Sequence, residues 1–219
     1  MEFNFSNLEF LKNLYIPAQF GGDRYDEDFT AVDDLAKQLP DDIEIKTGAT
    51  KVVLMLNDAF VAKISFNGTF DEYYKGNDEY EYRFTPFIHP DYCKIEKEIY
   101  DRANAEGLAM FFTQVDLLCE TKEGYPIYIA ERINSLYDGD YYDSSSRDSR
   151  EKANSIMEEA HTYINDSWAG AALEQYGEAL FKKFLKFLDE EDINDLHGGN
   201  IGFRNDGTPC LLDFSGYWE

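Results

Sequence analysis

The chain has 219 residues, of which 43 % are hydrophobic, and its 44 acidic and 20 basic residues give a formal net charge of -24 at pH 7. This hydrophobic content indicates a globular protein, and the negative charge disfavours binding to nucleic-acid phosphates or anionic lipid. The scattered cysteines, Cys93, Cys119 and Cys210, contain no CxxC pair, so they indicate neither a disulfide framework nor a zinc knuckle. With no signal-like segment or bilayer-length apolar run, a soluble cytoplasmic protein is expected.

Two short helices are predicted first. Apolar residues recur at helical spacing in "SNLEFLKNLY" and "TAVDDLAKQL", with Ser6 and Thr30 as N-caps and Pro40 closing the second helix. Residues 1–42 are therefore expected to form a helical extension ahead of the main fold.

From Ile43 the pattern changes to that of a sheet. "IEIKTGATKVVLML", the turn "NDA" and "FVAKISF" predict an antiparallel meander with Gly48 in its first connection. The acidic, tyrosine-rich stretch "GTFDEYYKGNDEYEYRF" has no clean periodicity. It is expected to be an inserted surface loop or a partly ordered arm.

A helix and a hairpin follow. In "DYCKIEKEIYDRANAEG" the apolar residues Ile95, Ile99 and Ala103 share one helical face, and Gly107 stops the helix. "FFTQVDLLCETKEGYPIYIAERI" predicts a hairpin about the turn "KEG". The polar stretch "DGDYYDSSSRDS" is the expected boundary, so residues 43–136 form one predicted lobe.

Residues 137–219 form the second predicted lobe. Helical spacing indicates two helices, at roughly 149–164 and 168–189. "NIGF", the turn "RNDGT" and "PCLLDF" then predict a short hairpin. The resulting fold class is α+β.

The stretch "INDLHGGNIGF", residues 193–203, allows three interpretations of Asp195, His197 and Asn200. A metal site is disfavoured, because the histidines of the chain have no mutual ligand spacing. In a purely structural interpretation, Asp195 caps a turn and the glycines adopt positive φ. The third interpretation is a phosphate-transfer loop.

Asp213 in "LLDFSG" favours the third interpretation. The predicted hairpin brings the ends of its strands together, so Asn200 and Asp213 could share one oxygen-preferring cation. Asp195 would then orient an attacking hydroxyl while magnesium neutralises charge on the transferred phosphate.

These motifs resemble the protein kinase-like fold, especially its aminoglycoside phosphotransferase branch. "NDLHGGN" is similar to the family loop HGDLHPGN and "DFSG" to the DFG element, with steps of five residues from Asp195 to Asn200 and thirteen from Asn200 to Asp213. The resemblance implies that Asp195 is the catalytic aspartate and that Asn200 and Asp213 bind Mg2+. It gives His197 a structural hydrogen bond.

The resemblance extends to the N-terminal half. "VAKI" is similar to the VAIK strand, which implies that Lys63 contacts the α- and β-phosphates of ATP. Alternatively, Lys63 is a solvated lysine on an edge strand. The following helix would supply the carboxylate that pairs with it, and Glu96 is preferred over Glu98 because apolar residues three, four and seven positions further on share its face.

Two weaker motifs concern the nucleotide. "KTGATKVV" occupies the place of the glycine-rich loop but retains only Gly48. "IYIAERI" resembles the hinge between lobes, where backbone groups from Glu131 to Ile133 would bind adenine. The alternative for this segment is an ordinary buried strand.

The chain also departs from the family pattern. Ile193 replaces the histidine that opens the catalytic loop, Ser215 replaces the DFG glycine, and six residues follow Asp213. The chain also resembles small kinase-like proteins of bacteria and phages that end soon after such an element. The expected architecture is an N-terminal antiparallel sheet lobe with one pairing helix and a truncated, mainly helical C-terminal lobe.

Three functions therefore stay open. The first is an ATP- and Mg2+-dependent phosphotransferase with an unknown acceptor, which could be a basic protein. The second is a pseudokinase or nucleotide-gated binding module, suggested by the degenerate glycine loop. The third is an acidic inhibitor that mimics DNA or captures a basic protein, suggested by the charge of -24.

Overall fold

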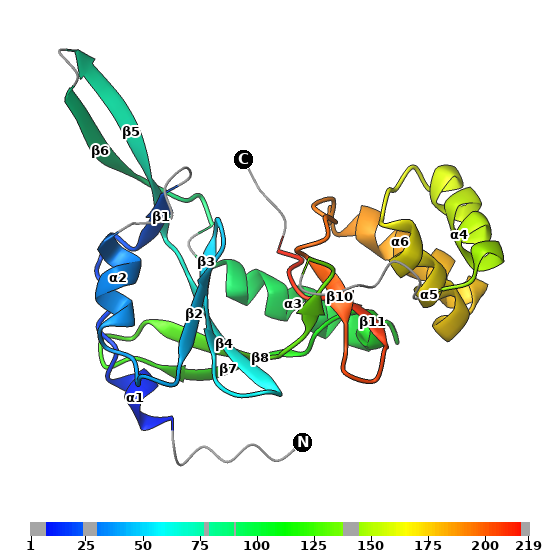
Figure 1. The fold of residues 1–219 in the computed structure, drawn as a ribbon, viewed down its shortest axis with the longest axis horizontal. Helices are drawn as coiled ribbons and strands as arrows, with labels where there is room; N and C mark the ends of the chain where they lie inside the picture. Colours follow the sequence, from blue (N-terminus) through cyan, green and yellow to red (C-terminus); the bar gives the residue numbers. More distant parts are fainter. Residues whose placement is uncertain (1–7, 24–29, 77–78, 90, 138–144, 216–219) are drawn as a thin grey trace. The chain divides into compact units, whose positions relative to one another are not determined.

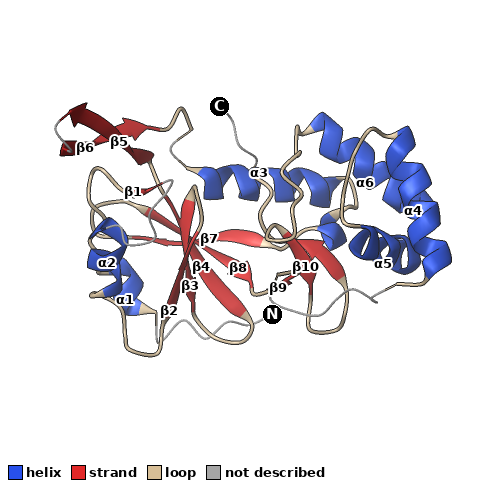
Figure 2. Ribbon diagram, turned by 45° about the horizontal axis from the view of Figure 1, so that its top comes forward, coloured by secondary structure: helices blue, strands red, loops and turns tan. Residues whose placement is uncertain are grey.

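The structure is a computed structural model that describes residues 8–23, 30–76, 79–89, 91–137 and 145–215. The chain divides into two compact units, each described by itself. Unit 1 comprises Met1–Ile95, Val115–Ala130 and Trp218–Glu219, and unit 2 comprises Glu96–Gln114 and Glu131–Tyr217. Strands dominate the first and helices the second (Figures 1 and 2), which confirms the predicted α+β class.

The main sheet of unit 1 has five strands in the order β2-β3-β4-β8-β7. Their bounds are β2 (Glu44–Thr47), β3 (Lys51–Met55), β4 (Phe60–Ser65), β7 (Val115–Glu120) and β8 (Pro126–Glu131). The pairs β2–β3, β3–β4 and β7–β8 are antiparallel. The predicted meander and hairpin are therefore confirmed.

The N-terminal segments pack on this sheet. Helices α1 (Glu9–Lys12) and α2 (Thr30–Ala36) are present, although α1 is shorter than expected and Thr30 is the first residue of α2 rather than its cap. Ser6 lies outside the described residues. Side chains from these segments and from the strands share one apolar core, which includes Leu11, Leu14, Phe20, Leu35, Val52, Leu54, Ile64, Phe66 and Ile127.

A second sheet of unit 1 corrects the sequence analysis. The tyrosine-rich stretch, expected to be an inserted surface loop or a partly ordered arm, forms a hairpin of two long strands, β5 (Gly68–Gly76) and β6 (Glu79–Pro86). Strand β1 (Gly21–Asp23), which the sequence did not indicate, pairs in parallel with β5. Tyr, Phe and Thr favour strands, but only β6 alternates charged and aromatic residues, whereas β5 carries the consecutive pairs Asp71–Glu72 and Tyr73–Tyr74, so no continuous alternation marks the hairpin. The hairpin projects from the body of unit 1 (Figure 1).

Helix α3 (Tyr92–Ala105) begins in unit 1 and continues into unit 2. Asp91 caps it, because its Oδ1 accepts hydrogen bonds from the Lys94 N–H (3.0 Å) and the Ser65 hydroxyl (3.0 Å). The helix stops before Gly107, whose φ of +74° suits glycine. The predicted helix and its stop are confirmed.

The described residues of unit 2 form three further α-helices and a small sheet. Its elements are the 3-10 turn η2 (Ala109–Phe111), β9 (Asn134–Ser135), α4 (Arg147–Glu159), α5 (Asp166–Tyr176), α6 (Glu178–Glu190), β10 (Ile201–Phe203) and β11 (Pro209–Leu211). The expected single helix over 168–189 is wrong, because Gly177, with φ +80° and ψ 163°, separates α5 from α6. The expected last hairpin is confirmed as β10–β11, which β9 extends on the β10 side.

An aromatic core joins the helices of unit 2 to its hairpin. The rings of Phe111 and Phe184 stack with 4.2 Å between their centroids, and the ring centroids of Trp168 and Phe184 lie 5.9 Å apart. The Trp168 indole Nε1–H donates to the backbone oxygen of Gly202 in β10 at 2.9 Å. The hairpin is thereby fixed against α5 and α6.

The chain crosses between the units after Ile95, Gln114 and Ala130. The stretch expected to be the linker, residues 138–149, lies largely outside the described residues, so the expected divisions at 42 and 136 stay predictions. In the described part of the chain, no helix has both the length and the apolarity needed to cross a bilayer.

Candidate functional site

The loop between α6 and β10 holds Asp195 and Asn200. Two buried side chains, Ile193 and Leu196, anchor this loop, whereas Asp195 between them is partly exposed. The Asn200 amide Nδ2 donates to the Asp195 backbone oxygen at 2.9 Å and to its carboxylate Oδ2 at 3.1 Å. Asn200 therefore fixes both the backbone and the carboxylate of Asp195.

The strand register brings Asp213 beside Asn200. Ile201 pairs with Leu211, and the backbone oxygen of Asn200 accepts the N–H groups of Leu212 at 2.9 Å and Asp213 at 3.4 Å. The Asp213 Oδ1 also accepts a hydrogen bond from the Ser215 hydroxyl at 3.3 Å. The hairpin thus unites Asn200 and Asp213, as the sequence analysis expected.

Phe214 anchors the chain directly after Asp213. Its ring is buried and meets Phe112 edge-on at 5.0 Å. The Thr113 N–H donates to the backbone oxygen of Leu211 at 2.9 Å. Asp213 is therefore held by the core of unit 2 on one side and by Asn200 on the other.

His197 has a structural role in this loop. Its Nδ1 accepts the backbone N–H of Gly199 at 3.0 Å, which leaves the proton of the neutral ring on Nε2. Nε2 lies 3.7 Å from the Asp195 Oδ1, beyond hydrogen-bond distance. The imidazole stacks on Tyr137 with 6.1 Å between ring centroids, a partner that the sequence did not indicate.

Lys63 lies in the middle of the main sheet. Strand β4 runs between β3 and β8, and Lys63, opposite Val53, is only 5 % exposed. It is therefore not a solvated lysine on an edge strand. A buried ammonium requires polar or charged partners, so the position indicates a specific role.

The two candidate glutamates of α3 differ in burial. Glu96 is 0 % exposed, whereas Glu98 lies on the exposed face of the helix. Burial favours Glu96 as the functional carboxylate, since a buried carboxylate must be compensated. Lys63 belongs to unit 1 and Glu96 to unit 2, so their pairing stays a prediction.

Gly48 and the segment from Glu131 to Ile133, the two weaker nucleotide candidates, have different surroundings. Gly48 lies in the exposed turn between β2 and β3, and a Cβ there would meet only the Lys51 oxygen at 3.8 Å. By contrast, Arg204 Nε donates to both carboxylate oxygens of Glu131, at 3.0 and 2.9 Å. The segment from Glu131 to Ile133 thus begins at a fixed residue.

Sequence reasoning missed Arg204. Its two terminal nitrogens donate to the backbone oxygens of Met110 at 2.9 Å and Phe112 at 2.8 Å, so one side chain joins η2, β8 and the β10–β11 turn. In the sequence it opens the polar string "RNDGT", which is typical of a solvated turn. A lone arginine beside such a turn carries no signal of this role.

A pocket of about 470 Å³ lies beside Asp195. The catalytic-loop candidates and the connection between α4 and α5 line it, and its residues include His161, Tyr163, Asp189, Asp192, Asp195 and His197. Its acidic side chains give it negative charge. A molecule in this pocket would contact Asp195.

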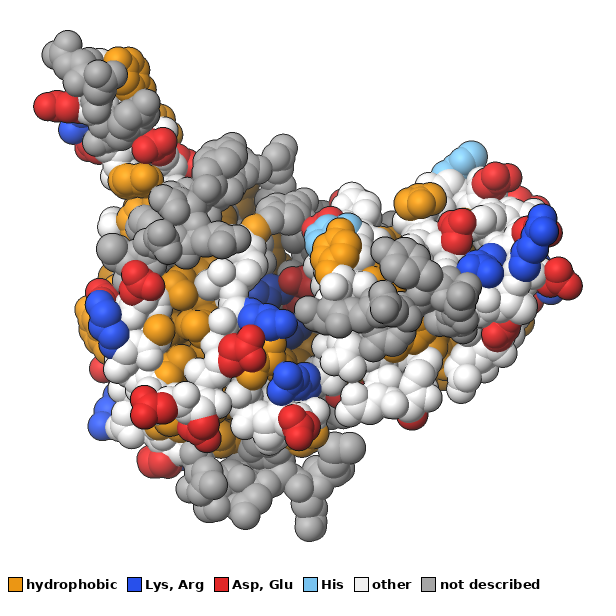
Figure 3. Space-filling view, in the orientation of Figure 1, with side chains coloured by type: hydrophobic (Ala, Val, Ile, Leu, Met, Phe, Trp, Pro, Cys, Tyr) orange, Lys and Arg blue, Asp and Glu red, His pale blue; other side chains and the backbone are white. Residues whose placement is uncertain are grey.

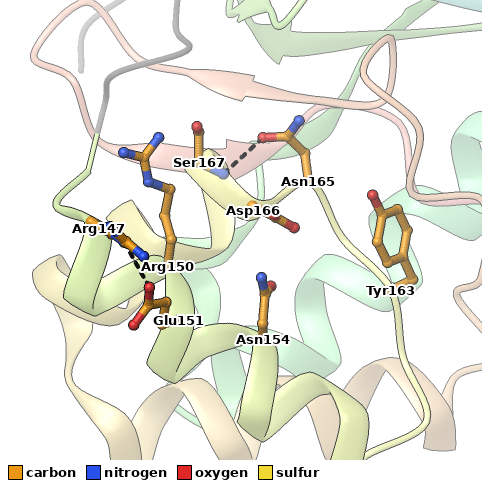
Figure 4. A pocket seen from close by; sticks show the side chains of 8 residues that line it. All are labelled: Arg147, Arg150, Glu151, Asn154, Tyr163, Asn165, Asp166 and Ser167. Atoms are coloured by element: carbon orange, nitrogen blue, oxygen red, sulfur yellow. Dashed lines mark hydrogen bonds and ion pairs between the residues drawn. The ribbon is translucent and has the colours of Figure 1, made fainter.

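A second pocket of unit 2 lies between α4 and the start of α5 (Figure 4). Its polar side chains serve the helices: Arg147 pairs with Glu151 at 2.7 Å, and the Asn165 Oδ1 accepts the Ser167 N–H at 3.0 Å. These contacts cap and stabilise the helices. The pocket does not include Asp195, Asn200 or Asp213.

Within the described ranges, no group of three or more His, Cys, Asp or Glu side chains lies close enough to hold a metal ion. A site made of Asn200 and Asp213 has one carboxylate and one amide, so it would need oxygen atoms from a phosphate or water to complete a coordination shell. No protein-family model matches the chain, and no curated protein matches its sequence.

Proposed function

We propose that the protein is an ATP- and Mg2+-dependent phosphotransferase with a protein kinase-like fold. The observation that carries the proposal is the arrangement at Asn200, whose amide holds Asp195 while its backbone oxygen accepts the N–H of Asp213. Three residue types needed for phosphoryl transfer are thereby joined by direct contacts. A turn cap would not require the second carboxylate.

The donor atoms fit magnesium. The hydrogen bonds place Nδ2 of Asn200 on the Asp195 side, so the amide Oδ1 points away from Asp195. Asp213 adds a carboxylate, and Mg2+ prefers such hard oxygen ligands while keeping phosphate oxygens and water in its shell. When bound, the ion neutralises charge on the transferred phosphate.

Asp195 is the proposed proton acceptor. Its carboxylate is partly exposed at the pocket of about 470 Å³, where a hydroxyl-bearing acceptor could reach it. As the acceptor oxygen bonds to the γ-phosphorus and the bond to the β-phosphate oxygen breaks, Asp195 takes the hydroxyl proton. Asn200 keeps the carboxylate in position through its amide.

Lys63 and Glu96 are assigned to the nucleotide. The burial of Lys63 in a central strand supports a contact with the α- and β-phosphates, because phosphate oxygens compensate a buried ammonium. Glu96 is the carboxylate proposed to orient it. Gly48 and the backbone from Glu131 to Ile133 complete the proposed nucleotide contacts.

The first test separates binding from transfer. ATP with Mg2+ should raise the melting temperature of the wild-type protein, and Asp195→Asn should retain that shift while ATP turnover falls about 100-fold or more. Asp189→Asn is the matched control, since it removes one carboxylate from the same pocket. Equal turnover in wild type and Asp195→Asn would refute the assignment of Asp195.

The second test concerns magnesium. Asp213→Asn should remove the Mg2+ dependence of ATP binding, whereas Asp206→Asn, in the turn of the same hairpin, should leave it intact. Nucleotide binding without turnover in the wild-type protein would favour the pseudokinase. Absence of any shift with ATP or GTP would reject the phosphotransferase and favour the acidic inhibitor.

A further inference from the structure

The β5–β6 hairpin, here called the arm, has two different faces. Residues that pair across an antiparallel ladder share a face, and the register pairs Phe70 with Phe84 and Glu72 with Tyr82 on one side. Tyr74 follows on the same side, because residues two apart along a strand point the same way. This side is called the tyrosine face.

The opposite face is polar and its groups contact one another. The Asp71 carboxylate accepts the Thr85 hydroxyl at 2.9 Å. The Arg83 guanidinium lies 4.9 Å from the centre of the Tyr73 ring. Glu81 also pairs with Lys75 and Arg83. Because the charged groups of this face already have partners within the arm, a bound polypeptide would form few additional contacts with them.

The tyrosine face presents aromatic rings to solvent. Phe70 and Phe84 meet edge-on at 5.0 Å near the root of the arm. Further out, Tyr74 is 62 % and Tyr82 47 % exposed. Glu72 lies opposite Tyr82 and two residues before Tyr74, and its carboxylate accepts the Tyr82 hydroxyl at 3.3 Å. Exposed rings along a two-stranded ribbon, which has little stability of its own, are typical of a binding surface.

The charge of the arm selects the partner. Among its described residues, the arm has four acidic and two basic side chains. Both basic side chains already pair with the Glu81 carboxylate, whose Oε2 lies 2.8 Å from the Lys75 ammonium and 3.6 Å from the Arg83 guanidinium. Acidic and aromatic side chains lie together along the arm (Figure 3). A second copy of the chain would bring another charge of -24 against this surface, whereas a cationic partner is attracted.

We propose that the tyrosine face binds an arginine-rich polypeptide segment. Tyrosine rings attract guanidinium groups, and Glu72, the neighbour of both exposed rings on this face, supplies a carboxylate for a charge-assisted hydrogen bond. The contact between Arg83 and Tyr73 on the polar face provides an example of the same chemistry within the arm. The binding does not depend on the proposed phosphotransferase activity.

Fluorescence anisotropy with a labelled synthetic peptide of alternating arginine and glycine tests the proposal, at about 0.15 M salt to screen long-range attraction. Tyr74→Ala with Tyr82→Ala should weaken binding about tenfold, because two cation–π contacts are lost. Tyr15→Ala is the control for the single change Tyr74→Ala. It removes a tyrosine of nearly equal exposure, 61 % against 62 %, from outside the arm, and neither change alters the net charge. Tyr74→Phe should retain binding.

A peptide with lysine in place of arginine measures the contribution of charge alone, and it should bind several-fold more weakly because the ammonium lacks the planar fork. Unchanged affinity in the double variant, equal weakening by Tyr15→Ala, or equal binding of both peptides would overturn the proposal. Sedimentation adds a further check: a wild-type dimer that dissociates on Tyr74→Ala would make a second copy the occupant. Circular dichroism confirms that the variants fold.

Discussion

Arg204 is predicted to hold unit 2 together at the segment proposed to bind adenine. Its guanidinium makes two hydrogen bonds to Glu131, at 3.0 and 2.9 Å, and one each to the backbone oxygens of Met110 and Phe112. Arg204→Met keeps much of the aliphatic volume but removes all four. The Glu131 carboxylate and the Phe112 oxygen then lose the arginine donor, whereas the Met110 oxygen still accepts the Tyr176 hydroxyl at 3.1 Å.

The free energy of unfolding lost in Arg204→Met depends on how far Arg204 and Glu131 are buried. The Arg204 side chain is 18 % and that of Glu131 32 % exposed, so water reaches the pair only in part. Hydrogen bonds to charged groups contribute about 1.5–3 kcal/mol each, and breaking a fully buried pair costs about 3–5 kcal/mol. Because Glu131 can be partly rehydrated after the change, the expected loss of unfolding free energy is about 2–4 kcal/mol.

Urea unfolding followed by Trp168 fluorescence measures this loss in unit 2. The other tryptophan, Trp218, is replaced by phenylalanine in every variant. Arg147→Met is the control, because Arg147 is 85 % exposed and pairs with an exposed glutamate, so its loss should cost at most about 0.5 kcal/mol.

A double-mutant cycle isolates the ion pair. In a Glu131→Gln background, Arg204→Met should cost less than in the wild type, because part of its interaction is already gone. ATP affinity should fall with the single change if the segment after Glu131 binds adenine. An Arg204→Met variant as stable as Arg147→Met would refute the reasoning.

Three further predictions concern other parts of the molecule. Gly177→Ala should destabilise unit 2 by about 1–3 kcal/mol in the same urea assay, since its backbone conformation is nearly restricted to glycine, and Gly177→Asn should not restore stability. Hydrogen bonds from Lys152 and Lys182 lower the pKa of the Glu178 carboxyl to about 2. The stabilising effect of the ionised carboxylate is therefore present above pH 4.5 and is lost as the pH falls towards 2. The urea midpoint of Glu178→Gln should lie below that of the wild type at pH 6 and approach it at pH 2. Burial raises the pKa of the Cys210 thiol to about 12, so a disulfide reagent at pH 8 should modify half-buried Cys119 first, and equally fast modification of Cys210 in the folded protein would contradict this.

Local pattern was sufficient for much of the fold. The apolar segments around Val52 and Ile64, joined by the turn "NDA", predicted the antiparallel meander, and the apolar face through Ile99 and Ala103 predicted α3. Helix α3 buries the side that its periodicity marks, and β4 is buried on both faces from Val61 to Ser65. The sequence of the arm did not allow this inference, because consecutive pairs such as Asp71–Glu72 and Tyr73–Tyr74 interrupt the alternation on β5 and put charged residues on both faces.

The break between α5 and α6 was also missed. Apolar residues continue at helical spacing through Gly177, so the hydrophobic pattern alone extends the helix. The positive φ of Gly177 ends α5 instead. A single glycine inside a periodic segment is compatible with either outcome, so the hydrophobic pattern could not distinguish one helix from two.

By itself, the sequence determined the order and spacing of the motif residues and the type of most elements, because periodicity and turn residues act over a few positions. Only the tertiary structure decided that Lys63 lies in a central strand and that Arg204 joins three segments. The structure also shows that the amide of Asn200 holds Asp195 and that Glu96 is buried, as the helical periodicity had favoured. The position of Lys63 and the contacts of Arg204 depend on the neighbours of a strand and on residues far apart in the chain, which no local pattern encodes. The stretch "INDLHGGNIGF" alone is compatible with several kinds of site. The β10–β11 hairpin, which brings Asp213 beside Asn200, favours the phosphate-transfer loop among them.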